Sequence, residues 1–239
     1  MKKVFGLIGE NIEHSFSKNY FEEKFKKQKL TRHKYINLDI TDISIIKKLI
    51  QNYNIRGLNI TSPYKEKVIP FLDKLSKDAQ NIKSVNTIQI INNKLIGHNT
   101  DIIGFENSFL PILNNRRNIL VLGNGGASKA IQFVLDKNNL NYQVVSRRLK
   151  LNYSKITKEL IRKNAVIINT TCLGMYPDIK TLPELPYEAL NSNHLLFDLV
   201  YNPKETLFLR NGKKQNTQIK NGYEMLKIQA ETSWEIWNT

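Results

Sequence analysis

Short apolar, β-branched runs alternate with stretches of helical periodicity along most of the chain. In the first half the pattern predicts strands at 3–8, 35–38 and 57–60, and helices at 18–27, 43–50 and 65–72. This order of elements is typical of a mostly parallel sheet with helices on its faces. Two further runs, 85–91 and 95–98, flank Asn92-Asn93, a dipeptide that tolerates positive φ, and so predict a hairpin at a sheet edge.

The pattern starts again in the second half, after a helix at 102–113 and a polar, turn-like stretch at 114–117. Strands are predicted at 118–122, 142–145, 165–169 and 195–199, and helices at 127–135, 156–161 and 223–237. In the last helix we expect Met225, Ile228, Gln229 and Trp234 to face inward. The fold class is therefore α/β, and 239 residues allow two domains.

Composition narrows the class of protein. With 41% hydrophobic and 24% charged residues, the chain is typical of soluble globular proteins. A net charge of +15 would suit binding to nucleic acid, but the lysines are spread through segments that are rich in Asn and Ile. We therefore expect a solvated basic surface and no nucleic-acid partner.

We expect a cytoplasmic protein with no membrane segment. The first apolar run is too short, and too broken by glycines, for a signal peptide, and no run reaches membrane-spanning length. The single cysteine, Cys172, allows neither an internal disulfide nor a zinc site of several cysteines. No metal is expected.

A glycine-rich loop stands where the strand at 118–122 passes into the next helix. It reads Gly123-Asn124-Gly125-Gly126-Ala127-Ser128. The first glycine permits a tight bend, the second lets the backbone approach a pyrophosphate, and the small residue lets the helix pack on the strand. The helix N-terminus offers N–H groups to the phosphates. The loop predicts a dinucleotide site, although the pattern alone also fits an ordinary glycine turn.

The residues after the following strand indicate which dinucleotide is bound. Ser146-Arg147-Arg148 stand where such folds place the residue that contacts the ribose. An acidic side chain there would favour NAD, whereas guanidinium groups can pair with a 2′-phosphate and stack on adenine. We predict NADP, with surface arginines of a basic protein as the alternative.

Polar clusters follow the strands of the first half, where open α/β sheets bind ligands. They are Glu13-His14-Ser15-Phe16-Ser17, Asn59-Ile60-Thr61-Ser62-Pro63-Tyr64-Lys65-Glu66, Ser84-Val85-Asn86-Thr87 and Gly97-His98-Asn99-Thr100-Asp101. Singly, each has an ordinary explanation as a helix cap, a turn or a surface charge. In this order, and with three later motifs at 168–175, 198–203 and 221–230, they resemble the shikimate dehydrogenases over almost the whole chain.

This resemblance implies an α/β protein with two domains joined by a cleft. Residues 1–103 and 222–239 would form a substrate-binding catalytic domain that the C-terminal helix completes. Residues 104–221 would form a Rossmann-type NADP-binding domain. The implied activity is reversible, NADPH-dependent reduction of 3-dehydroshikimate to shikimate, in chorismate and aromatic amino acid biosynthesis, by a monomer or homodimer.

The resemblance also assigns roles to single residues. Lys65 and Asp101 match the catalytic pair, and Ser15 and Ser17 match the serines that hold the substrate carboxylate. The other implied substrate-binding residues are Asn59, Thr61, Asn86, Tyr201 and Gln229. The implied cofactor residues are Gly123, Asn124, Gly125, Gly126, Ala127, Ser146, Arg147, Arg148, Thr170, Met175, Val200 and Gly222. The chemistry agrees, because hydride addition leaves an alkoxide that an ammonium group can stabilise and protonate.

The chain departs from the family pattern at several positions. Glu10-Asn11 stand where a proline is usual, Lys18 replaces a second proline, and Cys172 replaces a usual serine. The chain is also short around 149–163.

Three other interpretations fit parts of the sequence. A quinate/shikimate dehydrogenase has the same fold, a broader substrate range and often NAD as cofactor, and Arg147 disfavours only its NAD-dependent version. A methylenetetrahydrofolate dehydrogenase-like enzyme would not explain Ser15 and Ser17. A non-catalytic NADP-binding module would not need both Lys65 and Asp101.

Overall fold

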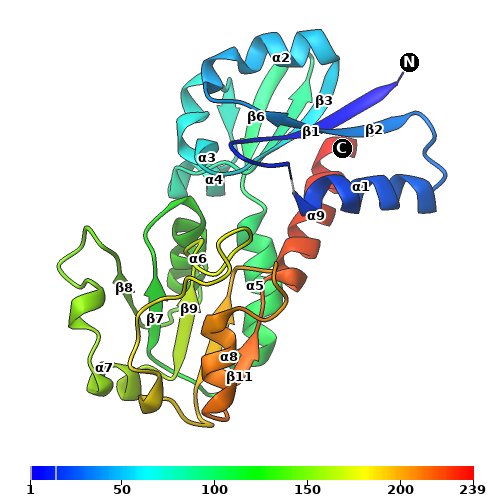
Figure 1. The fold of residues 1–239 in the computed structure, drawn as a ribbon. Helices are drawn as coiled ribbons and strands as arrows, with labels where there is room; N and C mark the ends of the chain where they lie inside the picture. Colours follow the sequence, from blue (N-terminus) through cyan, green and yellow to red (C-terminus); the bar gives the residue numbers. More distant parts are fainter. Residues whose placement is uncertain (1, 14) are drawn as a thin grey trace. The chain divides into compact units, whose positions relative to one another are not determined.

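Residues 2–13 and 15–239 are described in a computed structural model of the chain (Figure 1). His14, which belongs to the serine cluster, and Met1 lie outside the described residues. Contacts divide the chain into two compact units, 1–100 with 230–239 and 101–229. The sequence predicts a functional division into residues 1–103 with 222–239, which would bind the substrate, and residues 104–221, which would bind NADP. That functional division stays a prediction. Among the described helices, none combines the length and the apolar composition that crossing a bilayer requires.

The first unit is built on a six-stranded sheet in the order β2-β1-β3-β5-β6-β4. Its strands are β1 (Lys3–Gly9), β2 (His33–Asp39), β3 (Ile55–Ile60), β4 (Lys74–Leu75), β5 (Thr87–Ile91) and β6 (Lys94–His98). β1 pairs in parallel with β2 and β3, whereas β5 is antiparallel to β3 and β6. The carboxyl end of β3 therefore lies beside the start of β5, where Asn59 pairs with Thr87.

Helices cover both faces of this sheet. α1 (Phe16–Lys27) and the end of α9 (Tyr223–Asn238) pack on the face that carries Phe5, Leu7 and Tyr35. The opposite face is covered by η1 (Ile43–Ile45), α2 (Ile46–Tyr53), α3 (Tyr64–Lys67) and α4 (Lys77–Ile82). Alternate residues of β1 thus belong to two cores, as the period of two along a strand requires.

Two predictions for this unit need correction. Asn92 and Asn93 adopt φ of 50° and 61°, and the β5–β6 hairpin forms, but β4 pairs with β6, so the hairpin does not lie at the sheet edge. The helix predicted at 65–72 ends at Lys67 and is followed by the short 3₁₀ turn η2 (Ile69–Phe71). Pro70 lacks the N–H that a longer α-helix would use.

The second unit has a five-stranded parallel sheet in the order β11-β10-β9-β7-β8. Its strands are β7 (Ile119–Leu122), β8 (Tyr142–Val145), β9 (Val166–Asn169), β10 (Leu195–Asp198) and β11 (Gln218–Lys220). The strand order reverses at β7, so the carboxyl ends of β7 and β9 lie at a switch point, where such sheets bind ligands.

Helices cover the second sheet as well. α5 (Asp101–Leu113) and α6 (Gly126–Lys137) pack together, and Phe105 of α5 lies 5.4 Å from the ring of Phe197. η4 (Tyr187–Ala189), α7 (Lys158–Lys163) and α8 (Leu207–Lys214) pack around a separate apolar cluster. In the described region between β8 and β9 the regular elements are η3 (Tyr153–Lys155) and α7.

Gly57 on β3 gives a test of the packing of α9 on the first sheet. A Cβ at this position would lie 2.4 Å from the ring of Trp237, whose Nε1 donates to the Ile88 carbonyl oxygen at 3.0 Å. We expect Gly57→Ala to lower the free energy of unfolding by about 1–3 kcal/mol, because the indole has to move. Urea unfolding followed by tryptophan fluorescence measures this, since both tryptophans, Trp234 and Trp237, lie in the first unit.

Gly125→Ala is the matched control. A Cβ on Gly125 meets nothing within 4 Å and its φ of −94° suits alanine, so its unfolding free energy should stay within about 0.5 kcal/mol of wild type. Equal stability of the Gly57→Ala variant and the wild type would contradict the observed packing of Trp237.

Candidate functional site

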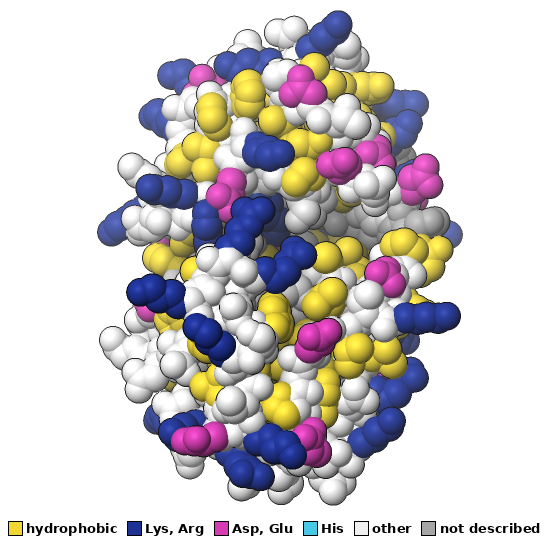
Figure 2. All heavy atoms as spheres, turned by 60° about the vertical axis from the view of Figure 1, so that its left-hand side comes forward, with side chains coloured by type: hydrophobic (Ala, Val, Ile, Leu, Met, Phe, Trp, Pro, Cys, Tyr) yellow, Lys and Arg dark blue, Asp and Glu magenta, His cyan; other side chains and the backbone are white. Residues whose placement is uncertain are grey.

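The surface charge shows no single basic stripe on the face drawn in Figure 2. Lys and Arg side chains are distributed over this face, with acidic and uncharged side chains between them. This distribution is typical of a solvated surface. In open α/β sheets, small ligands bind at the carboxyl ends of the strands, so the residues that follow the strands are described next.

Ser15 and Ser17 stand at the start of α1. Ser15 is the N-cap residue, and its hydroxyl accepts the Ser17 N–H at 3.2 Å. Ser17 is buried, with 8% of its surface exposed. The first turn of α1 thus presents the two predicted carboxylate-binding serines together.

The loop before Ser15 is held by Asp39 at the end of β2. The Asp39 carboxylate accepts the N–H groups of Asn11 and Ile12, each at 3.1 Å. The Ile12 carbonyl oxygen then accepts the Ser15 N–H at 3.0 Å. Asn11 has φ of 56°, which proline cannot adopt. The departure from proline here is therefore matched by a different means of holding the loop.

A buried polar network connects Ser17 to β3, β5 and α9. The Tyr35 hydroxyl hydrogen-bonds to Ser17 and donates to Asn59 Oδ1 at 2.8 Å. Burial raises the pKa of Tyr35 well above its usual value, so this hydroxyl stays protonated. Asn59 Nδ2 donates to the hydroxyls of Thr87 (3.2 Å) and Ser233 (3.0 Å). The Asn59 amide is therefore engaged inside the protein, which favours a role in holding the network over direct substrate contact.

Asn86 is held by Thr100 at the end of the β5–β6 hairpin. Its Oδ1 accepts the Thr100 N–H at 2.7 Å, and its Nδ2 donates to the Thr100 hydroxyl at 3.1 Å. The Thr100 hydroxyl also lies 3.3 Å from that of Ser233. Burial lowers the pKa of the neighbouring His98, so the imidazole next to this network is neutral at pH 7.

Thr61 and Lys65 follow β3 at the same end of the sheet. The Thr61 N–H donates to the Ile8 carbonyl oxygen at 2.9 Å. The Lys65 carbonyl oxygen accepts the Val85 N–H at 2.8 Å, next to Asn86. The structure thus gathers Ser15, Ser17, Asn59, Thr61, Lys65 and Asn86 at one end of the first sheet.

Asp101 and Gln229 belong to facing helices in the second unit. Asp101 begins α5 and is 6% exposed. One turn later, a Cβ on Gly104 would lie 2.7 Å from the Met225 carbonyl oxygen and 3.2 Å from Gln229 Cβ. Gly104 therefore allows α5 to approach α9 closely near Gln229.

The glycine-rich loop adopts the geometry that its sequence predicts. Gly123 has φ of 107°, and a Cβ there would lie 2.5 Å from the Thr170 hydroxyl. Gly125 is the N-cap of α6, so Asn124 precedes the helix while Gly126 and Ala127 form its first turn. The Ser128 hydroxyl donates to the Gly123 carbonyl oxygen at 2.8 Å and closes the turn.

Thr170 after β9 and the loop Ser146-Arg147-Arg148 after β8 border this turn. The Thr170 hydroxyl donates to the Leu122 carbonyl oxygen at 2.7 Å, and the Gly123 N–H donates to the Val145 carbonyl oxygen at 2.8 Å. Ser146 accepts the Arg148 N–H at 3.2 Å. Arg147 and Arg148 are both exposed. The predicted cofactor residues at the ends of β7, β8 and β9 are therefore neighbours.

A buried carboxylate, Asp198, organises the ends of β9 and β10. It accepts hydrogen bonds from Asn169 Nδ2 (2.9 Å), the Thr206 hydroxyl (2.6 Å) and the Val200 N–H (3.0 Å). Burial raises its pKa to about 6, and these three donors oppose the shift. This carboxylate fixes the loop that carries Val200 and Tyr201.

Gly222 and Met175 complete the predicted cofactor residues. The Gly222 N–H donates to the Val200 carbonyl oxygen at 3.2 Å. Met175 is 41% exposed and its N–H donates to the carbonyl oxygen of Cys172, an exposed free cysteine. Gly222 and Val200 are therefore brought together, whereas Met175 lies on the loop after β9.

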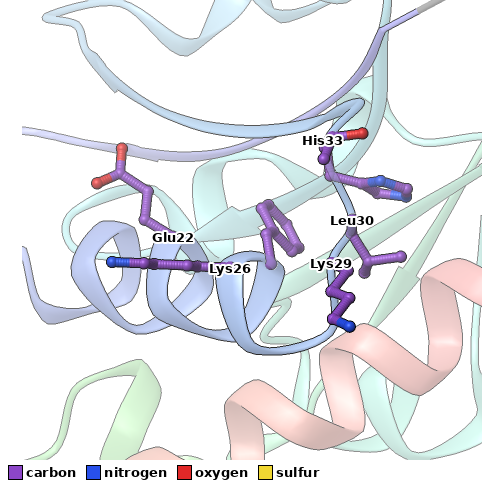
Figure 3. A pocket seen from close by; sticks show the side chains of 7 residues that line it. Glu22, Lys26, Lys29, Leu30 and His33 are labelled. Carbon is purple, nitrogen blue, oxygen red and sulfur yellow. The ribbon is translucent and has the colours of Figure 1, made fainter.

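A surface hollow of about 500 Å³ lies elsewhere in the first unit, beside the end of α1 (Figure 3). It is lined by Glu22, Phe25, Lys26, Lys29, Leu30, Thr31 and His33. None of the predicted site residues is among them, so this hollow is separate from the candidate site.

Sequence reasoning assigned no role to several residues that hold the site. They are Tyr35, Asp39, Thr87, Asp198 and Ser233, of which Thr87 and Asp198 stand within motifs already named from the sequence. Ser233 lies four residues after Gln229 and hence on the same side of α9. A polar residue on this partly buried face is a feature from which its role could have been predicted. Asp39 gave none, because its partners are backbone groups of another loop.

A family model and individual related proteins point to the same family for this chain. The family described as "Shikimate dehydrogenase substrate binding domain" matches residues 7–88. The shikimate dehydrogenase (NADP(+)) of Clostridium beijerinckii is 39% identical over 252 residues, covering 98% of this chain and 92% of that protein. The enzyme of the same name from Methanococcus maripaludis is 37% identical over 258 residues, covering 98% and 91%.

A solved structure extends this likeness to the fold. Shikimate 5-dehydrogenase from Thermus thermophilus, in complex with NADP(H) and shikimate, superposes with a TM-score of 0.86 at 28% identity. The match covers 98% of this chain and 93% of that one. The two-sheet α/β architecture is therefore that of a known group of enzymes.

The raised pKa of Asp198 predicts a pH-dependent stability. Between about pH 4 and pH 6 the folded state keeps a proton that the unfolded state releases, so stability should fall as pH rises through this window. A shift from the ordinary value of 3.8 to about 6 corresponds to roughly 3 kcal/mol at pH 7.

Urea unfolding followed by far-UV circular dichroism, from pH 4 to pH 7, measures this effect. As the pH rises from 4 to 7, the free energy of unfolding of the wild type should fall relative to that of Asp198→Asn by up to about 3 kcal/mol. Weaker hydrogen bonds to the amide in the variant would add an offset that does not depend on pH. A constant difference would show that Asp198 titrates normally.

Proposed function

We propose that this chain, which belongs to the shikimate dehydrogenase family, catalyses the reversible, NADPH-dependent reduction of 3-dehydroshikimate to shikimate. The observation that carries the proposal is the assembly of Ser15, Ser17, Thr61, Lys65 and Asn86 at one end of the first sheet. Enzymes named for this activity, 37–39% identical over nearly the whole chain, support it.

The second unit offers a fitting site for NADP. The open space at Gly125, where a Cβ would meet nothing within 4 Å, suits the close approach of a pyrophosphate. The first turn of α6 supplies N–H groups to the phosphates, and Arg147 and Arg148 are exposed for a 2′-phosphate. When bound, NADPH supplies the hydride.

Different side chains of the protein bind the substrate and transfer the proton. We infer that the hydroxyls of Ser15 and Ser17 hold the carboxylate, and that Thr61, Asn86, Asp101, Tyr201 and Gln229 bind ring oxygens. The Lys65 ammonium donates to the ketone oxygen, stabilises the alkoxide as it forms and protonates it. The Asp101 carboxylate accepts a hydrogen bond from a substrate hydroxyl.

The functional division of the chain forms part of the proposal. Residues 1–103 with 222–239 bind the substrate, and residues 104–221 bind NADP. The enzyme acts in the cytoplasm as a monomer or homodimer, in the biosynthesis of chorismate and aromatic amino acids.

The direct test is shikimate oxidation with NADP and NAD side by side, with quinate as a rival substrate. Shikimate and NADP should be preferred, because an arginine and no acidic residue follows β8. Arg147→Ala should raise the KM for NADP by roughly tenfold or more and change that for NAD by far less. Equal changes for both cofactors would show that Arg147 does not bind the phosphate.

Lys65→Ala tests the proton-transfer assignment. We expect kcat to fall by about 10²–10⁴, because the lysine interacts most strongly with the oxygen as charge develops on it. Shikimate should still bind in an equilibrium titration. Lys67→Ala, an exposed lysine two residues later, is the matched control and should keep near-normal turnover. Normal turnover of the Lys65→Ala enzyme would remove Lys65 from the mechanism.

A further inference from the structure

We propose that Glu231 is a positioning residue: its carboxylate fixes the first turn of α1, with Ser15 and Ser17, and thereby sets the affinity for the substrate. The inference rests on the proposed function and concerns the first unit alone.

The Glu231 carboxylate joins α9 to α1 through both of its oxygens. The Tyr20 hydroxyl donates to Oε1, and Lys24 Nζ donates to Oε2 at 2.5 Å. Tyr20 and Lys24 are four residues apart, so they lie on the same face of α1. One carboxylate thus holds two consecutive turns of α1.

The ion pair is shielded from solvent on its cationic side. The Lys24 side chain is 11% exposed, and its Nζ also lies 5.8 Å from the ring centre of Trp234. Removing the carboxylate would leave this ammonium with poor solvation, so the interaction is more consequential than an exposed pair.

The contact lies one turn from the serines. The Tyr20 ring stacks on Phe16 with centroids 5.5 Å apart, and Phe16 stands between Ser15 and Ser17. A displacement of Tyr20 is therefore transmitted to the residue between the two hydroxyls. The Ser15 hydroxyl caps this same turn.

The apolar contacts of α1 do not fix this position by themselves. Phe21 and Phe25 hold the helix on the sheet, at 0% and 5% exposure. Apolar burial is non-directional, whereas hydrogen bonds to a carboxylate depend on distance and angle. Glu231 therefore supplies a directional contact between α1 and α9.

The expected effect is on binding and not on turnover. The serines hold the substrate carboxylate, which does not change charge during reduction, so their contacts are equal in the ground state and the transition state. Weakening such uniform binding raises KM and leaves kcat unchanged.

Glu231→Gln is the test variant, because its amide oxygen can still accept from Tyr20 while its NH₂ group faces the Lys24 ammonium. We expect the KM for shikimate to rise roughly 5–20-fold, with kcat and the KM for NADP within about twofold of wild type. Glu235→Gln, the same change at an exposed position one turn later on α9, should behave as wild type.

Tyr20→Phe provides a second variant should Glu231→Gln fail to fold. It should raise the KM for shikimate by a smaller factor, and the combined variant should show less than the product of the two effects, since both act through one carboxylate. An unchanged KM for shikimate in a folded variant, or an equal change in kcat or in the KM for NADP, would overturn the inference. If the wild-type enzyme fails to oxidise shikimate, the proposed function itself is wrong.

Discussion

The amide of Asn59 belongs to a residue that is only 5% exposed, so its donors and its acceptor need partners inside the protein. It does so with Tyr35, Thr87 and Ser233, which come from β2, β5 and α9. Each partner is placed by an element far away in the sequence, so the network is complete only when the sheet and α9 have assembled. Ser17, bound to the Tyr35 hydroxyl, is positioned by the same requirement.

In the second unit, a buried carboxylate has the role that the Asn59 amide has in the first. Asp198 is buried among Asn169, Thr206 and the Val200 N–H, and these donors hold the ends of β9 and β10. A carboxylate whose pKa is raised by burial is costly to keep at neutral pH. The cost is concentrated beside the loops that carry Thr170, Val200 and Tyr201, where local rigidity serves ligand binding.

The periodic pattern predicted the longer elements and the division into two sheets, because amphipathic helices and buried strands repeat over enough residues to be recognised. It missed β4, α4, α8 and β11, which are short and take their stability from neighbours. For the site, the glycine-rich loop was predictable, since a positive φ at Gly123 restricts the residue type. The Asn59 network was not, because 174 residues separate Asn59 from Ser233 and no local rule relates them.

The departures from the family pattern show how positioning can be retained with different residues. Proline limits a loop through the fixed φ of its own ring. Here Asn11 has φ of 56°, and the restriction comes from outside the loop, through the Asp39 carboxylate that accepts two of its N–H groups. Glu231 acts similarly on the helical side of Ser15. The serines are then held from both directions along the chain by carboxylates on β2 and α9, so the geometry of this part of the site depends on tertiary contacts more than on local backbone stiffness.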